Sequence, residues 1–185
     1  MANELQGQKI AFVVSNEGIE QAELTDPWQA VVDAGAEAHL IAPKSGQAQA
    51  FNHLDKADVF PVDRTTREVS MDEYDGLMLP GGVANADLLR MDEPAVALTR
   101  AFFDAGKPAA VICHAPWMLV EADVVRGRTI TSWPSLKTDI RNAGGSWVNE
   151  EVRVDGLLVT SRKPADLPAF CTRMVEIFGA RVTAS

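Results

Sequence analysis

The sequence predicts an α/β fold built on a largely parallel sheet. Residues 9–14 form a short apolar run that a helical segment ending at Gly35 follows, and residues 37–43 form a second apolar run. A strand, a helix and a strand in this order make a parallel unit. Residues 108–112 are a third apolar run, of the kind that a parallel sheet buries on both faces.

The other expected elements continue this alternation. Residues 58–63 and 67–70 are short strand candidates, which we expect to pair as a hairpin at the edge of the sheet. A helix over residues 92–105 places Phe102 and Phe103 on its apolar side. The remaining expected elements are strands at 76–79, 129–131, 147–154 and 156–160 and helices at 136–143 and 165–178.

Length and composition indicate one domain over residues 1–185, because 46% of the residues are hydrophobic and 23% are charged. The 26 acidic against 17 basic residues, a net charge of −9, argue against nucleic acid or an anionic membrane as the main partner. No segment has the length of a membrane span, and residues 1–6 lack the basic and apolar regions of a signal peptide. Two distant cysteines suit a reducing compartment, so we expect a cytoplasmic protein.

Cys113 lies where the central apolar run changes into a helical pattern. Pro116 is tolerated in a first helical turn, so Cys113 is expected at a strand-to-helix corner. The free N–H groups of a helix start and the adjacent His114 favour the thiolate, and a nucleophile on such a corner is typical of a nucleophile elbow. The alternative is a small core hydrophobe, which is the role that we expect for Cys171.

Two loops bring polar groups to the carboxyl edge of the predicted sheet, where ligands bind in open parallel sheets. Residues 15–27 follow the first strand and carry Glu20 and Glu23 among their carboxylates. Residues 80–82 (Pro-Gly-Gly) follow the strand at 76–79, and glycines there allow a tight turn that exposes backbone N–H groups to a ligand. By itself, a Pro-Gly-Gly segment is also compatible with a purely structural turn.

Eight motifs spread over nearly the whole chain resemble the PfpI family of intracellular cysteine peptidases. This family belongs to the superfamily of the parkinsonism-associated deglycase and the class I glutamine amidotransferase domains. The resemblance implies a flavodoxin-like sandwich, a mostly parallel sheet with helices on both faces, and obligate dimers or higher oligomers. The motifs are residues 19–23 (IEQAE), 79–82 (LPGG), 87–90 (DLLR), 106–108 (GKP), 110–116 (AVICHAP), 125–128 (VRGR), 142–144 (NAG) and 159–162 (VTSR).

The resemblance implies that a carboxyl group from the loop after the first strand hydrogen-bonds the Cys113 thiol. Its position relative to Pro27 favours Glu23 over Glu20. A carboxyl beside a thiolate resists ionisation, so Glu23 is expected to be protonated and to donate to the sulfur. The alternative is a solvated glutamate in the first turn of a helix. The resemblance also implies that the backbone N–H groups of Gly82 and His114 serve as oxyanion donors.

Helical neighbours point about 100° apart, so the imidazole of His114 is expected to turn away from Cys113 and outward. In the resembling family it meets an acid from a neighbouring subunit, which completes a Cys-His-acid triad. The matching position is Asp87, although one extra residue separates it from Gly82 and a helix N-cap is its alternative role. Trp133, with the two residues after it, is expected at the pocket rim or in the core.

These groups support attack by a thiol on an electrophilic carbonyl. The first hypothesis is a PfpI-type, peptidase-like cysteine hydrolase of stress protection. The second is a glyoxalase or protein deglycase that acts on methylglyoxal and its adducts, and the third is a non-catalytic redox sensor or chaperone. The expected partners are further copies of the chain and a peptide or small carbonyl substrate, and no cofactor or metal is expected.

Overall fold

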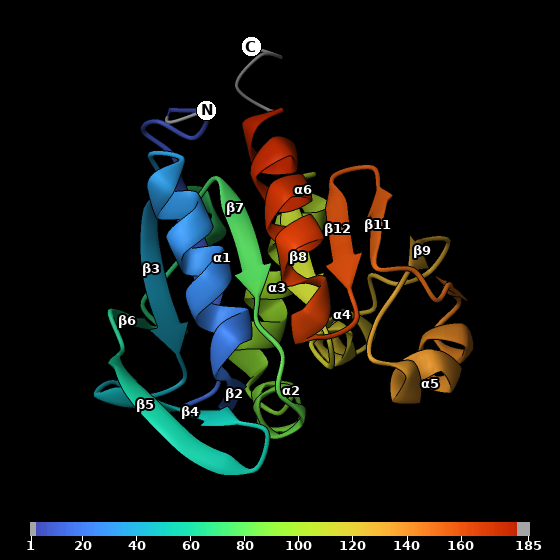
Figure 1. Cartoon of the computed structure of the whole chain (residues 1–185), viewed down its shortest axis with the longest axis horizontal. Coiled ribbons are helices and arrows are strands. Elements are labelled where there is room, and N and C mark those ends of the chain that lie inside the picture. Colours follow the sequence, from blue (N-terminus) through green and yellow to red (C-terminus); the bar gives the residue numbers. More distant parts are fainter. Residues whose placement is uncertain (1–2, 181–185) are drawn as a thin grey trace.

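A seven-stranded sheet runs through the centre of the computed structural model, which describes residues 3–180 (Figure 1). The strand order is β11-β12-β8-β7-β1-β3-β6, and every neighbouring pair is parallel except β11 and β12. The predicted α/β class and mostly parallel sheet are therefore confirmed. The strands are β1 (Lys9–Val13), β3 (Glu37–Ala42), β6 (Arg64–Thr65), β7 (Gly76–Leu79), β8 (Ala109–Ile112), β11 (Val152–Asp155) and β12 (Leu158–Ser161).

Successive residues of β1 alternate between two hydrophobic layers, as the pleat of a strand requires. Ile10 and Phe12 pack in one layer, whereas Ala11 and Val13 pack in the other. Helices cover both faces, as predicted, since each layer is closed by a different set. Helices α1 (Gln21–Asp33) and α6 (Leu167–Gly179) close the first layer, and α2 (Val83–Leu89), α3 (Glu93–Asp104), α4 (Pro116–Glu121) and α5 (Lys137–Asn142) bury residues in the second.

A second sheet, of order β2-β4-β5, lies beside the carboxyl edge of the first one. It contains β2 (Glu17–Glu20), β4 (Gln47–Asn52) and β5 (Asp55–Pro61), and β4 and β5 form an antiparallel hairpin. The predicted hairpin was wrong in its second strand, because residues 67–70 form no strand. The Glu68 carboxylate instead accepts hydrogen bonds from the N–H and the hydroxyl of Thr65, each at 2.9 Å, and closes a turn there.

The C-terminal third departs from the prediction at one strand. The single strand expected at residues 147–154 is two elements, β10 (Ser146–Trp147) and β11. Val148 donates its N–H to Ile130 of β9 (Thr129–Ile130), so β10 pairs in a small separate sheet before the chain crosses to the central one. The helix expected at 136–143 is present as α5, and a short 3-10 turn at residues 134–136 precedes it.

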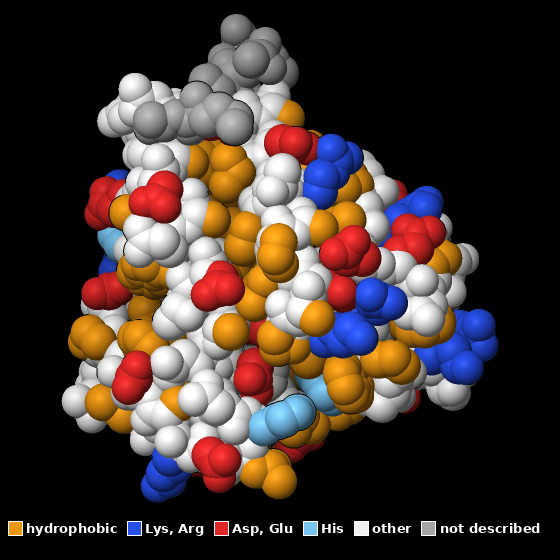
Figure 2. All heavy atoms as spheres, viewed as in Figure 1, with side chains coloured by type: hydrophobic (Ala, Val, Ile, Leu, Met, Phe, Trp, Pro, Cys, Tyr) orange, Lys and Arg blue, Asp and Glu red, His pale blue; other side chains and the backbone are white. Residues whose placement is uncertain are grey.

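On the face drawn in Figure 2, acidic side chains are scattered, and most basic ones lie on the side of β11, β12 and α5. No helix within residues 3–180 has both the length and the apolar character that a membrane span needs. Residues 1–2, which belong to the N-terminal segment considered above for a signal, lie outside the described residues.

Two adjacent phenylalanines in α3 test the packing of the second layer. Phe102 is completely buried, whereas Phe103 is half-buried. The centroid of the Phe103 ring lies 4.9 Å from the guanidinium carbon of Arg128. We expect Phe102→Ala to lower the free energy of unfolding by about 3–5 kcal/mol, because it leaves a cavity in the core. Phe103→Ala is the matched control and is expected to lower it by about 1 kcal/mol. Urea unfolding of both variants measures the difference, and equal losses would contradict the placement of the layer.

Candidate active site

Cys113 occupies a strained corner between β8 and α4. Its φ angle is 65°, a left-handed conformation that residues other than glycine rarely adopt. The backbone holds it there from both sides: its N–H donates to the carbonyl of Ser161 (3.0 Å), and its carbonyl accepts from the N–H of Trp133 (2.8 Å). The predicted strand-to-helix corner is confirmed, and its geometry is that of a nucleophile elbow.

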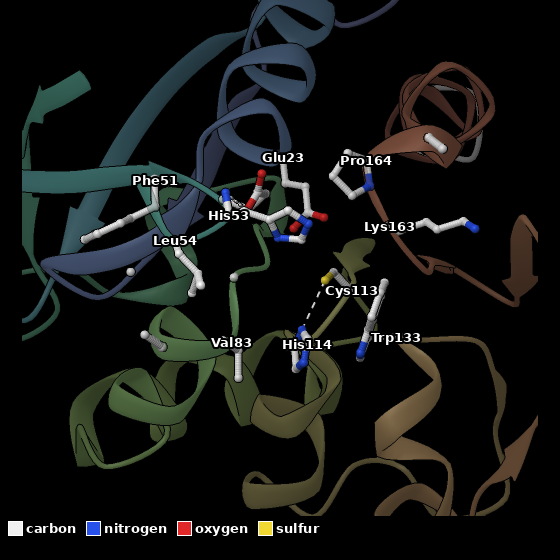
Figure 3. A pocket seen from close by; sticks show the side chains of 15 residues that line it. Glu23, Phe51, His53, Leu54, Val83, Cys113, His114, Trp133, Lys163 and Pro164 are labelled. Atoms are coloured by element: carbon white, nitrogen blue, oxygen red, sulfur yellow. Dashed lines mark hydrogen bonds between the residues drawn. The ribbon is translucent and has the colours of Figure 1, made fainter. Parts of the chain in front are cut away.

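The His114 imidazole lies against the thiol, with Nδ1 3.2 Å from Sγ of Cys113 (Figure 3). The expectation that the ring turns away from Cys113 was wrong, because the left-handed Cys113 is not part of the helix and helical spacing does not apply to it. The ring stacks on Trp133 (5.8 Å between centroids) and meets the edge of Trp117 (5.4 Å). Burial lowers the pKa of His114 from 6.5 to about 4, so the imidazole is neutral at pH 7.

Glu23 lies in the first turn of α1 with its side chain completely buried beside Gly81 and Cys113. The expected alternative, a solvated glutamate, is therefore wrong. Neither carboxyl oxygen completes a hydrogen bond among the described residues. Burial, followed by the negative charge of Glu20, raises the pKa of Glu23 from 4.5 to about 8, and the nearby Cys113 thiol and Gly81 backbone only partly oppose this. The expectation of a protonated Glu23 agrees with this shift.

The Cys113 sulfur is not activated at rest. The residue is only 7% exposed, and burial raises the pKa of the thiol; Glu23 raises it further when its carboxyl is ionised. The backbone N–H groups of Gly82 and His114 hydrogen-bond the sulfur and lower the pKa of the thiol. They therefore lie close to the sulfur, where oxyanion donors are needed. The expected thiolate at a helix start was wrong in direction, because desolvation outweighs the N–H groups of Gly82 and His114, neither of which belongs to α4.

Asn85 fixes the loops around the thiol, and the sequence analysis missed it. Its side chain is buried; Oδ1 accepts from the N–H of Ser15 (2.7 Å), and Nδ2 donates to the carbonyls of Pro80 (3.0 Å) and Gly81 (3.1 Å). It thereby joins the loop after β1 to the loop after β7. An asparagine three residues after Gly82, at the start of a helix, was the available signal.

The described chain does not bring Asp87 to His114. Asp87 is exposed within α2 and has no side-chain hydrogen bond or ion pair among residues 3–180. The alternative role as a helix N-cap was wrong, because α2 begins at Val83 and its N-cap is Gly82. A role for Asp87 through a neighbouring subunit stays a prediction.

The other expected residues take the following places. Glu20 lines the pocket and accepts a hydrogen bond from the backbone N–H of His53 (3.2 Å). The carboxyl that lies beside the thiol is that of Glu23. Trp133 lines the pocket, as one of its two expected roles requires. Cys171 is half-buried on α6 and packs against the first layer, in agreement with its expected structural role.

Glu23, Cys113 and His114 line a cavity of about 560 Å³ at the carboxyl edge of the central sheet (Figure 3). The floor holds Cys113 and Glu23, the β4–β5 hairpin supplies one wall, and Lys163 and Pro164 stand opposite. Among residues 3–180, no cluster of three or more His, Cys, Asp or Glu side chains is arranged to hold a metal ion. The arrangement can bind a small carbonyl against a thiol, with a neutral imidazole and a protonated carboxyl beside it.

The sequence model of the DJ-1/PfpI family matches residues 8–177, which cover nearly the whole chain. The chain belongs to the DJ-1/PfpI family. It is 40% identical to a deglycase of Pyrococcus horikoshii over 91% of this chain and 98% of the relative. It is also 40% identical to a protein/nucleic acid deglycase of Escherichia coli, over 94% of this chain and 99% of the relative.

Solved structures agree with this assignment. The fold of this DJ-1/PfpI protein matches the crystal structure of Drosophila melanogaster DJ-1beta with a TM-score of 0.82, over 93% of this chain and 90% of the other, at 25% identity. The predicted family and the flavodoxin-like fold that it implies are therefore confirmed.

The raised pKa of Glu23 makes the stability of the protein depend on pH. The folded protein keeps a proton on Glu23 that the unfolded chain releases above pH 4.5, so this group makes the free energy of unfolding fall as pH rises from 4.5 to about 8. Glu23→Gln removes this loss, so we expect the variant to gain stability over the wild type, and to gain more at pH 8 than at pH 5. Urea unfolding at both pH values measures the gain.

The exposed Glu17 provides the control for this measurement, since Glu17→Gln is expected to change stability equally at pH 5 and pH 8. Parallel pH dependences in the wild type and in Glu23→Gln would contradict the raised pKa.

Proposed function

We propose that this protein is a cysteine hydrolase of stress protection that removes methylglyoxal-type adducts from amino and thiol groups, which makes it a deglycase. The observation that carries the proposal is the buried Glu23 carboxyl, with a pKa near 8, against the Cys113 thiol. An acid with a pKa near the working pH can both give and take a proton. The names of the two relatives described above give independent support.

In the proposed reaction, the Cys113 sulfur bonds to the carbinol carbon of the adduct, the C–N bond breaks, and the amine leaves with the proton that Glu23 holds at rest, so that Glu23 becomes a carboxylate. Nδ1 of His114, 3.2 Å from Sγ, takes the thiol proton as the S–C bond forms. Glu23 then moves a proton from this carbon to its neighbour by way of an enediolate, whose oxygen the N–H groups of Gly82 and His114 stabilise. Water hydrolyses the resulting thioester, so one adduct and one water give the free amine and a 2-hydroxy acid.

Peptide hydrolysis, which the sequence analysis placed first, becomes the second candidate. The contact of His114 Nδ1 with the thiol favours it, because it leaves Nε2 free to meet a carboxylate, as in a Cys-His-acid triad. Asp87 of a second copy of the chain is the predicted carboxylate. Deglycation ranks higher because its proton-transferring groups, Cys113, His114 and Glu23, all belong to one chain.

Removal of the thiol tests the enzymatic proposal. We expect Cys113→Ala to lower the release of lactate from a methylglyoxal-treated peptide by at least about a hundredfold, since the covalent step is lost. Cys171→Ala is the matched control and is expected to keep the wild-type rate. Equal rates of lactate release for Cys113→Ala and the wild type would exclude deglycation through Cys113 and leave peptide hydrolysis and the sensor or chaperone role. Digestion of unfolded casein by the same variants tests the second candidate.

Asp87→Ala separates the two enzymatic candidates. If a neighbouring Asp87 orients His114, casein digestion is expected to fall by about a hundredfold, with lactate release and alkylation of Cys113 by iodoacetamide within about twofold of the wild type. Asp104→Ala, an exposed aspartate at the end of α3, is the control. If the wild type digests casein and Asp87→Ala digests it at the same rate, Asp87 has no part in the mechanism.

A further inference from the structure

His53 stands over the pocket in a conformation that the local sequence does not favour. Asn52 pairs with Asp55, so His53 and Leu54 form a two-residue hairpin loop between β4 and β5. The φ angle of His53 is 61°, where hairpin loops of this length normally carry glycine or asparagine. Strain of this kind persists where the surroundings impose it and is concentrated at functional sites.

The hairpin is anchored to the site by its backbone. The N–H of His53 donates to Oε2 of Glu20 (3.2 Å), and Glu20 in turn donates its own N–H to the carbonyl of Gly81, which lies beside the Glu23 carboxyl. The position of His53 is therefore tied to the loop at residues 80–82, which lies beside the carboxyl of Glu23.

Within the part of the chain that the structure describes, the imidazole of His53 has no partner. Among the described residues, no hydrogen bond, ion pair or ring contact engages it, although it lines the same cavity as Cys113. Figure 3 shows the side chain projecting from the hairpin into the pocket, on the side of Glu23 and across from His114. An imidazole offers an N–H donor in each of its protonation states, so a ligand oxygen in the pocket can accept a hydrogen bond from it.

We propose that His53 binds the second oxygen of a vicinal dicarbonyl group while Cys113 adds to the first carbonyl, so that the pocket selects substrates with two adjacent oxygens. This inference rests on the proposed function, because a methylglyoxal-type adduct carries the same two adjacent oxygens, one of them as a hydroxyl. In the addition, the S–C bond forms and the π bond of the attacked carbonyl breaks. The thiol proton ends on the new hydroxyl, and nothing is oxidised or reduced. The neighbouring oxygen accepts the imidazole N–H and distinguishes a dicarbonyl from a simple aldehyde.

The test uses reversible protection of Cys113 against iodoacetamide. The probes are 2,3-butanedione, which has two adjacent carbonyls and no aldehyde hydrogen for further conversion, and butanal, which has one carbonyl and the same number of carbons. His53→Gly removes the imidazole, and glycine suits the left-handed backbone at this position. Asp55→Asn on the same hairpin is the control, because its side chain does not line the cavity.

We expect His53→Gly to raise the half-protecting concentration of 2,3-butanedione by about tenfold, the factor for one lost hydrogen bond of about 1.4 kcal/mol. Protection by butanal is expected to stay within about twofold, and Asp55→Asn is expected to match the wild type. No change with 2,3-butanedione, or an equal loss with both probes, would overturn the inference. Failure of the wild type to release lactate would contradict the proposed deglycase function, yet protection would still report on His53.

Discussion

The candidate active site depends on one buried carboxyl group, that of Glu23, which completes no hydrogen bond among residues 3–180. Burying an ionised carboxylate in such a place costs more free energy than burying the neutral acid, so the fold itself keeps the proton on Glu23. The proton in turn removes the negative charge that would further oppose ionisation of the Cys113 thiol. The two groups are thus coupled, and a change at one alters the proton affinity of the other.

The parallel sheet is what makes this coupling possible. Strands β8, β7 and β1 are neighbours in the sheet. The segment between β1 and α1, the Gly81–Gly82 turn after β7 and Cys113 after β8 therefore meet at its carboxyl edge. Gly81 is required there, because a Cβ at this position would overlap Oε2 of Glu23 and the Cβ of Cys113. Asn85 then ties the loop after β1 to the loop after β7, through hydrogen bonds between its side chain and their backbones.

The sequence predicted the parts of this site that local patterns encode. The change of period at Cys113 revealed the corner, and Pro116 revealed the start of α4. The orientation of His114 was not predictable, because it follows from a left-handed Cys113 that no propensity favours. The direction of the thiol pKa was missed for a similar reason, since burial depends on contacts between distant segments. The β4 strand was missed because its alternating signal at Ala48 and Ala50 is carried only by alanines.

The three side chains at the reacting centre carry no charge at rest, and this bears on selectivity. At pH 7 the imidazole of His114 is neutral, Glu23 holds its proton, and Cys113 is a thiol. A thiol reacts slowly with oxidants and general electrophiles, because the thiolate is the reactive form. A carbonyl oxygen that binds the N–H groups of Gly82 and His114 provides the place where negative charge can develop. In the proposed reaction, the nucleophile is therefore formed only when a carbonyl is bound, which would protect a buried cysteine from reactions with other electrophiles.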